Sequence, residues 1–346
     1  MLYVGLDLSR KRIDYCVLDE EGVIVEQAAA PADADGLCGL ARRVAPSRQP
    51  VLAAVESMNG ARFVHDQLEQ CGWQVDVADA ARVRGLAPLA CKTDRIDAWV
   101  LAELCRRDLV PAIWLPDQQV RGTRERARFR LHLVKHRTAL KNRIHQTLVT
   151  FGKPCPVSDL FAVGGRQLLE RLALPDPWAG TVAASLRLID ELDREIDAIE
   201  RELRRLGADH RYLPLLVTVP GIAWVLGYTI AAEIGDIDRF ASPVKLAGYT
   251  GLCPRVYQSG EHDRRGPLSK RGPRYLRWAL IEAAVHACNH PLYAERYQAL
   301  KARHGRQRGA KVAQVDLARR LTTAIWHMLT RNQPFAPAGA TKVLAA

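Results

Sequence analysis

The alternation of apolar and polar positions in the first hundred residues predicts a small α/β domain. Residues 2–8, 13–18 and 23–27 have the composition of short strands, and an acidic Glu-Glu-Gly turn between the last two indicates an antiparallel meander. Residues 51–56 are a nearly continuous apolar run, which is typical of a buried parallel strand, and residues 73–78 predict a fifth strand. Helix-like segments at residues 35–45 and 60–71 separate these later strands.

Three antiparallel strands followed by two helix-connected strands are the order of the α/β ribonuclease-H-like fold. In that fold the first and fourth strands lie side by side at the centre of the sheet. Asp7 and Glu56 are then expected to project from neighbouring strands. The helix that begins within residues 92–98 is expected to bring Asp94 and Asp97 over them, so the sequence predicts four converging carboxylates.

Two interpretations fit the pair Asp94 and Asp97, whose three-residue spacing places both on one helix face. Asp94 as an N-cap and Asp97 as the acidic N3 residue is the favoured interpretation of the pair alone. Four crowded carboxylates, however, repel each other by several kcal/mol unless a cation neutralises them, so the whole set favours a metal site. Carboxylate oxygens suit Mg²⁺ or Mn²⁺, and two such ions about 3.5–4 Å apart promote phosphodiester chemistry.

Beyond residue 116 the pattern changes to long helices. Residues 120–143 hold nine Lys or Arg and one acid, which predicts a helix of about 30 residues whose cationic faces favour phosphate contact over a merely solvated surface. Gly and Pro within residues 151–180 predict a bend. Apolar residues from Ile189 to Leu206 follow a 3-4-3-4-3 spacing, which fits either pairing with the basic helix or a dimeric coiled coil. The basic residues of the first helix are Arg121, Arg124, Arg126, Arg128, Arg130, Lys135, Arg137, Lys141 and Arg143.

The last third predicts a separate and mostly α-helical domain. Residues 217–223 resemble a helix-hairpin-helix turn, in which backbone N–H groups hold a DNA phosphate, but an ordinary Pro-Gly turn between core helices explains them equally well. Ser259 precedes Gly260, a common turn pair, and stands ahead of a guanidinium cluster that would hold a phosphate beside its hydroxyl. That cluster is Arg264, Arg265, Lys270, Arg271, Arg274 and Arg277. A further basic run at residues 301–311 predicts a DNA-facing loop before a final helix at residues 311–331.

The changes of pattern along the chain predict domain boundaries, and the composition narrows the class of protein. The boundaries expected are an α/β domain at 1–115, a basic-helix and coiled-coil region at 116–210, a C-terminal domain at 211–335 and a tail at 336–346. Fifty Lys and Arg against 38 Asp and Glu favour a polyanionic partner. No apolar run is long enough to span a bilayer, so we expect a cytoplasmic protein with no membrane partner. The eight cysteines include no C-x-x-C pair, which argues against a zinc site.

Six segments together resemble the insertion-sequence family 110 transposases, and the resemblance covers nearly the whole chain. The family implies a DEDD-type DNA recombinase with a RuvC-like N-terminal domain, a coiled-coil region and a C-terminal transposase domain. Its members use a bridge RNA that pairs with donor and target DNA. The six segments are Gly5-Leu6-Asp7, Glu56-Ser57-Met58-Asn59-Gly60, Lys92-Thr93-Asp94-Arg95-Ile96-Asp97-Ala98, Pro220-Gly221-Ile222, Leu246-Ala247-Gly248-Tyr249-Thr250-Gly251-Leu252 and Tyr257-Gln258-Ser259-Gly260.

By this resemblance, the acidic tetrad is Asp7, Glu56, Asp94 and Asp97, and the catalytic serine is Ser259. The serine hydroxyl is implied to attack a DNA phosphodiester, giving a covalent phosphoserine and a free 3′-OH, while the tetrad binds Mg²⁺. The family's site joins one protomer's tetrad to another's serine, which implies a homo-oligomer, either a dimer or a tetramer.

A serine hydroxyl is a poor nucleophile until a base or a metal activates it, and no histidine occupies an evident position in the sequence, which favours the metal. Two local departures from the family pattern are His262-Asp263 after Ser259 and Ala223 in place of a second glycine.

Three other functions remain in view. A RuvC-like nuclease or Holliday-junction resolvase would use the same tetrad with water and form no covalent intermediate. An actin-like ATPase or sugar kinase would need a glycine-bearing phosphate loop after the first strand, and residues 7–11 contain none. A non-catalytic nucleic-acid scaffold would keep the fold alone. The resemblance favours the transposase, which would be nucleoid-associated when bound to DNA.

Overall fold

The computed structural model describes residues 1–87, 93–153, 155–260 and 262–336. The chain divides into two compact units, Met1–Leu115 and Pro116–Ala346, and each has its own hydrophobic core. Lys92, in the segment 92–98, and most of the tail expected at 336–346 lie outside the described residues.

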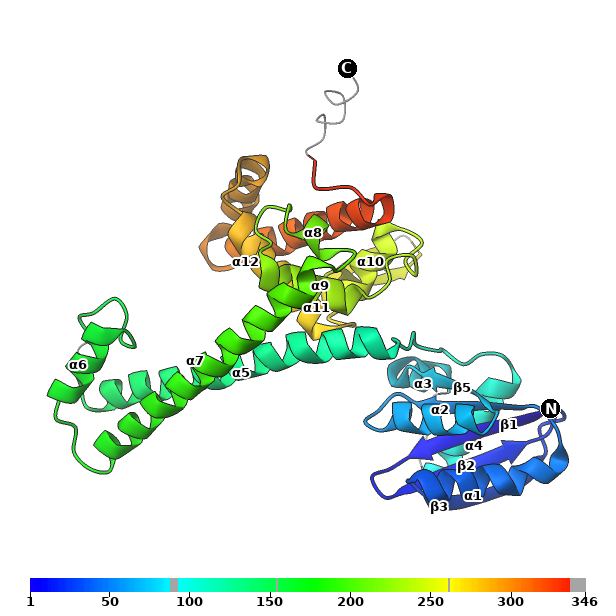
Figure 1. Ribbon diagram of the computed structural model, residues 1–346. Coiled ribbons are helices and arrows are strands. Elements are labelled where there is room, and N and C mark those ends of the chain that lie inside the picture. Colours follow the sequence, from blue (N-terminus) through cyan, green and yellow to red (C-terminus); the bar gives the residue numbers. More distant parts are fainter. Residues whose placement is uncertain (88–92, 154, 261, 337–346) are drawn as a thin grey trace. The chain divides into compact units, whose positions relative to one another are not determined.

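The first unit is built on a five-stranded sheet with the strand order β3-β2-β1-β4-β5 (Figure 1). The antiparallel strands are β1 (Leu2–Leu8), β2 (Arg12–Leu18) and β3 (Ile24–Pro31). β4 (Val51–Glu56) pairs parallel with β1, and β5 (Gln74–Ala78) pairs parallel with β4. This is the ribonuclease-H-like order, so the fold predicted for the N-terminal domain is confirmed.

The two faces of the sheet carry different helices. α1 (Ala34–Val44) and α2 (Ala61–Gln70) cover one face, where Leu6, Leu40 and Leu68 belong to the same buried cluster. Such apolar burial stabilises a domain by about 25 cal/mol per Å². The short helices η1 (Ala45–Ser47) and α3 (Ala80–Leu86) are additions that the sequence did not predict.

α4 (Asp94–Arg106) covers the other face and lies against β1, β2 and β4. Ala98 and Ala102 of this helix are fully buried with Cys16 of β2. Gly5 makes the contact with β1 very close, because a Cβ built there would lie 1.9 Å from the carbonyl oxygen of Ala98. Small residues on both elements therefore fix how near the helix stands to the centre of the sheet.

The second unit begins with two long helices that pair in opposite directions (Figure 1). They are α5 (Gln118–Thr150) and α7 (Trp178–Ala208), and α6 (Val163–Arg171) lies in the segment that joins them. Ile189, early in α7, is buried with residues near the end of α5, whereas Leu203, late in α7, is buried with Ala127 near its beginning. The heptad seam is thus used within the chain, which is the first of the two alternatives that the spacing allowed.

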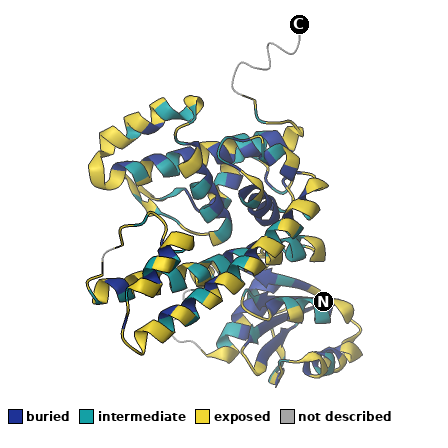
Figure 2. Ribbon diagram, turned by 60° about the vertical axis from the view of Figure 1, so that its left-hand side comes forward, coloured by how far each residue is buried: buried dark blue, intermediate teal, exposed yellow. Residues whose placement is uncertain are grey.

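The remaining helices surround the largest apolar core, to which Ile230, Leu280 and Leu321 contribute. Figure 2 shows that buried positions concentrate in this core and around the sheet, whereas α5 and α7 keep exposed outer faces. The helices of this part are α8 (Leu213–Leu216), α9 (Trp224–Ile234), α10 (Pro243–Thr250), α11 (Arg274–Ala287) and α12 (Pro291–Arg331).

The basic run at residues 301–311 is helical, so the loop predicted there is wrong. It lies within α12, which consists of two helical segments that meet at Gly305, with φ 75°. The absence of a side chain at Gly309 lets it approach Lys301, since a Cβ there would lie 2.1 Å from the Lys301 carbonyl oxygen. One glycine therefore breaks the helix and the other permits its two segments to pack closely.

Within the described residues no helix combines the length and the apolar character needed to cross a bilayer. Each cysteine among them is a free thiol.

Gly5→Ala is expected to destabilise the first unit by about 3 kcal/mol or more, because the methyl group enters space held by the α4 backbone. Gly39→Ala is the matched control. It sits within α1, where the nearest atom to a new Cβ is 3.9 Å away, so it is expected to stabilise by about 0.5–1 kcal/mol. Chemical denaturation measures both, and equal effects of the two substitutions would contradict the packing described.

Candidate active site

Asp7 and Glu56 lie side by side on the face of the sheet that α4 covers. Leu6 pairs with Val55 across β1 and β4, and both belong to the core on the other face. Alternation along a strand then turns the next residues, Asp7 and Glu56, toward the face on which Gly5 meets α4. The pairing of the first and fourth strands thus brings these carboxylates together as the sequence predicts.

Asp94 and Asp97 both stand in the first turn of α4, but neither is its N-cap. Thr93 holds that position, with extended backbone, and its hydroxyl accepts a hydrogen bond of 3.3 Å from the backbone N–H of Ile96. The prediction of Asp94 as N-cap and Asp97 as N3 is therefore wrong, because Asp94 is the first residue of the helix. Both carboxylates remain where the positive end of the helix dipole favours an anion.

The electrostatic state of Asp7 shows how closely these groups gather. Burial and, after it in order of size, the negative charges of Asp94, Asp97, Glu56 and Asp14 together raise the pKa of Asp7 to about 6. Ionising all of these groups together is unfavourable, and a bound cation would relieve the repulsion. The tetrad predicted from the sequence therefore shares one region of negative potential.

These carboxylates do not, however, form a closed metal-binding cluster among the described residues. In the described part of the chain, no three His, Cys, Asp or Glu side chains converge closely enough to hold a metal ion. Glu56 and Asp97 do line one small pocket, together with Arg84 of α3. The donor set, made of hard oxygen atoms, suits Mg²⁺ or Mn²⁺ in chemistry, although its oxygens do not form a closed coordination shell.

Asp14 and Arg12 also belong to this face, and the sequence reasoning missed them. Asp14 pairs with Asp7 across β1 and β2, and only 3% of its surface is exposed. The Arg12 guanidinium donates to both Asp14 oxygens, at 2.8 and 3.0 Å, and reaches Asp94 at 3.4 Å. The available signal was the Arg-x-Asp spacing in β2, which turns both side chains to the same face as Cys16.

Ser259 lies in a different setting, at the end of an exposed two-stranded hairpin. β6 (Pro254–Ser259) and β7 (His262–Leu268) pair antiparallel, and Ser259 is paired with His262. All three of Tyr257, Ser259 and His262 are exposed. The serine is therefore accessible to a large substrate.

The base of this hairpin is held by close backbone contacts. A Cβ on Gly272, with φ 109°, would lie 1.9 Å from the carbonyl oxygen of Tyr249, and one on Gly251, with φ 70°, would lie 2.4 Å from that of Arg271. Arg277 donates to the Lys270 carbonyl at 3.1 Å. Arg277 therefore supports the loop, in addition to any contact it makes with a phosphate.

Many of the basic residues predicted to bind nucleic acid have partners within the second unit. Arg128 donates to both carboxylate oxygens of the fully buried Glu233, at 2.7 and 2.9 Å, and Arg124 donates to backbone carbonyls of the same helix. Lys135 lies over the ring of Tyr275. Three more arginines pair with acids of α7: Arg126 with Glu202, Arg130 with Glu200 and Arg137 with Asp193. Much of the positive charge of α5 thus balances acids inside the protein.

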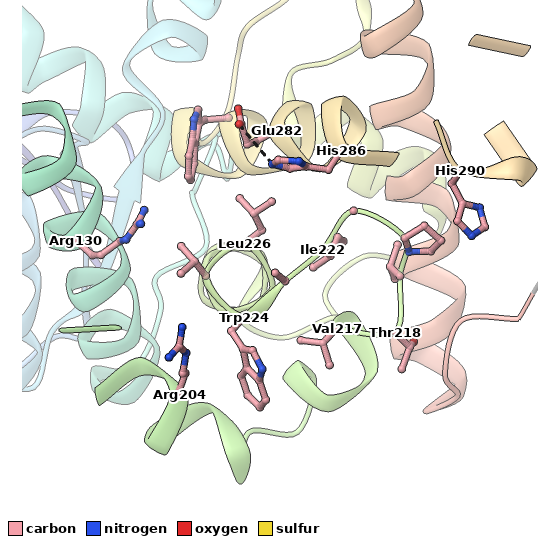
Figure 3. A pocket seen from close by; sticks show the side chains of 16 residues that line it. Arg130, Arg204, Val217, Thr218, Ile222, Trp224, Leu226, Glu282, His286 and His290 are labelled. Atoms are coloured by element: carbon pink, nitrogen blue, oxygen red, sulfur yellow. Dashed lines mark ion pairs between the residues drawn. The ribbon is translucent and has the colours of Figure 1, made fainter. Parts of the chain in front are cut away.

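The Pro220-Gly221 turn lines a cavity of about 800 Å³. Gly221, with φ 83°, packs against α11, since a Cβ there would lie 2.4 Å from the Ala283 carbonyl oxygen. Figure 3 shows Arg204 and Trp224 on one side of α9 and His286 on the other. The close packing on α11 accounts for the glycine without a phosphate, so the helix-hairpin-helix interpretation stays a prediction.

Comparison with known proteins gives two matches to transposase families. The model DEDD_Tnp_IS110, described as a transposase, matches residues 4–152, and the model of the transposase IS116/IS110/IS902 family matches residues 213–298. The first match covers the sheet and the acidic tetrad, and the second covers the hairpin with Ser259.

Individual relatives agree with these matches. The transposase for insertion sequence element IS1328 of Yersinia enterocolitica is 30% identical over 244 residues, which are 68% of this chain and 70% of that protein. A probable family 20 transposase of Pseudomonas aeruginosa is 29% identical over 301 residues, 83% of this chain and 86% of the relative. A pilin gene-inverting protein of Moraxella bovis is 26% identical over 254 residues, 70% and 68% of the two chains.

By their names these relatives are transposases and a gene-inverting protein, and the two family matches cover the sheet that carries the tetrad and the hairpin that carries the serine. The chain belongs to the IS116/IS110/IS902 family of insertion-sequence transposases, and it is a DNA recombinase.

Proposed function

We propose that the chain catalyses Mg²⁺-dependent DNA strand cleavage and exchange through a covalent phosphoserine intermediate. In this proposal the Oγ atom of Ser259 attacks a DNA phosphodiester and releases a 3′-OH, and Asp7, Glu56, Asp94 and Asp97 hold the metal ion. The observation that carries it is the gathering of these four carboxylates on one face of a ribonuclease-H-like sheet, where burial and the neighbouring charges together raise the pKa of Asp7 to about 6. The exposure of Ser259 at the hairpin end supports its role as the nucleophile.

A bound Mg²⁺ or Mn²⁺ would supply Lewis-acid stabilisation of charge at the reacting phosphate. The chain's own residues have separate tasks. The tetrad keeps its oxygens on one face, Thr93 fixes the start of α4, and Arg12 holds Asp14 and Asp94 in place through its guanidinium. Because Ser259 and the tetrad belong to different units, we propose that the complete site forms in a homo-oligomer, a dimer or a tetramer.

DNA contact is proposed for the cationic residues of α5 and of the segment after the hairpin. Eight of them are exposed, and two of these eight, Arg126 and Arg265, pair with Glu202 and Asp263. The other six are the first candidates: Lys135, Arg143, Arg264, Lys270, Arg271 and Arg274. Phosphate contacts of this kind make binding strongly dependent on salt.

A RuvC-like nuclease or junction resolvase is the second candidate, because its tetrad would occupy the same sheet. It differs in using water as the nucleophile, so Ser259 separates the two mechanisms.

Ser259→Ala is expected to abolish the covalent protein–DNA adduct and to lower recombination by about 10³-fold or more, because no other atom replaces Oγ. Glu56→Gln and Asp94→Asn are expected to lower both as strongly by weakening the metal site. The measurement is denaturing electrophoresis of protein incubated with a plasmid that carries the gene and its flanking DNA. Ser158→Ala, at another exposed serine of the second unit, is the matched control and should retain both activities.

The phosphoserine recombinase and the hydrolytic nuclease predict different results for these variants. Cleavage by Ser259→Ala at the wild-type rate, without an adduct, would establish the hydrolytic nuclease. Unchanged cleavage by Asp94→Asn would remove the metal assignment.

Asp7→Asn is expected to stabilise the metal-free protein at pH 8 by about 1–2 kcal/mol. The folded state holds the Asp7 proton more tightly than the unfolded chain, so wild-type stability falls as the pH rises from about 4 to 6 and stays lower above it. The gain should therefore be small at pH 4 and complete by pH 7. Denaturation midpoints in EDTA measure it, and Mg²⁺ should raise the midpoint of the wild type only.

The matched control is Asp35→Asn, at an exposed acid of the first turn of α1, which should show no such growth with pH. A gain for Asp7→Asn that is already complete at pH 4 would contradict the electrostatic origin.

Guidance by a bridge RNA is proposed on the family resemblance, since cationic faces do not distinguish RNA from DNA. The DNA beside the gene is expected to encode a structured non-coding segment whose loops are complementary to the element ends and to the insertion site. Sequencing of RNA that copurifies with the protein tests this, and flanking DNA without such a segment would contradict it. A nucleoid-associated cytoplasmic location belongs to the same proposal.

A further inference from the structure

Ser259 and His262 face each other across the end of the β6–β7 hairpin. They are the final residue of β6 and the first residue of β7, and they are paired in the register of the two strands. Residues paired across antiparallel strands point to the same face, with Cβ atoms about 4.5–5.5 Å apart. Rotation about the side-chain bonds therefore brings an imidazole nitrogen within reach of the serine Oγ.

The same face of the hairpin carries suitable neighbours. Tyr257 is paired with Arg264 one step further from the turn on that face, so a guanidinium stands beside the serine and the imidazole. Asp263 points to the opposite face, where it accepts hydrogen bonds from Arg265 at 2.8 and 3.0 Å. His262 is therefore exposed beside a nucleophile and a cation, and the adjacent carboxylate is occupied elsewhere.

We propose that His262 is a catalytic residue that acts as the general base for Ser259. This proposal rests on the proposed phosphoserine mechanism and adds to it the group that takes the proton. As the bond from Oγ to phosphorus forms, the Oγ proton moves to the imidazole. The bond from phosphorus to O3′ breaks, and O3′ takes a proton from water to become the free 3′-OH.

The second half of the reaction uses the same group in reverse. A 3′-OH attacks the phosphoserine, the bond from Oγ to phosphorus breaks, and the imidazolium returns its proton to Oγ. His262 thus supplies locally what a metal held by another part of the protein would otherwise have to supply at the serine.

His262→Gln is expected to slow adduct formation by about 10²-fold, a typical contribution of general base catalysis, while DNA affinity stays within twofold of wild type. His262→Ala should be equally slow, and added imidazole should restore part of its rate. Both are measured in single turnovers with saturating plasmid that carries the gene and its flanks. The matched control is Gln258→Ala, an exposed neighbour of Ser259 whose side chain points to the opposite face, and it should react at the wild-type rate.

Ser259→Ala in the same assay separates the proposed role of His262 from the phosphoserine mechanism on which that role rests. Loss of the adduct in Ser259→Ala together with wild-type rates in both His262 variants would overturn the role of His262 alone. A defect of the His262 variants that disappears at saturating DNA, or that imidazole does not relieve in His262→Ala, would overturn it as well. An adduct that persists in Ser259→Ala would overturn the phosphoserine mechanism itself.

Discussion

The close packing of α4 on the centre of the sheet is the constraint on which the candidate site depends. Gly5 and Ala98 leave so little room that the helix start is fixed over the ends of β1 and β4. Asp94 and Asp97 then share a face with Asp7 and Glu56, and burial together with the neighbouring charges raises the pKa of Asp7. The repulsion among these groups is a direct result of the packing that brings them together, and Arg12 offsets part of it.

Much of the fold of the first unit follows from the hydrophobic periodicity of the sequence and from the order of the predicted strands. Strands such as 2–8 and 51–56 are recognisable because their apolar positions reflect which faces of the sheet are covered. The order of the strands then indicates the fold and places Asp7 beside Glu56. Asp14 escaped notice because a single acid in a strand resembles a solvent-facing residue. Its burial depends on α4 and on Arg12, and neither contact is visible in a local pattern.

The same limit of local sequence patterns explains the other differences between the predictions and the structure. Thr93 and Asp94 are both residue types that favour the N-cap, so residue preference alone does not choose between these two neighbours, and the structure has Thr93 there. The basic run at 301–311 lacks an apolar period, yet it is helical on both sides of the break at Gly305 within α12. The cationic helix α5 was expected to be mostly free for phosphate, whereas acids of α7 and the buried Glu233 take up many of its guanidinium groups. Pairings between distant segments of this kind leave no signal in a window of sequence.

The hairpin that carries Ser259 has two strands and largely exposed side chains, so little apolar burial holds its end in one conformation. An isolated pair of strands is marginally stable in water, and a nucleophile placed there acquires a defined geometry chiefly from what binds to it. In the proposed mechanism the attacking hydroxyl therefore stands on an element whose own packing does little to fix its conformation. Attack on random DNA then carries the entropy cost of ordering the hairpin end, and a partner that makes enough contacts with the hairpin offsets that cost.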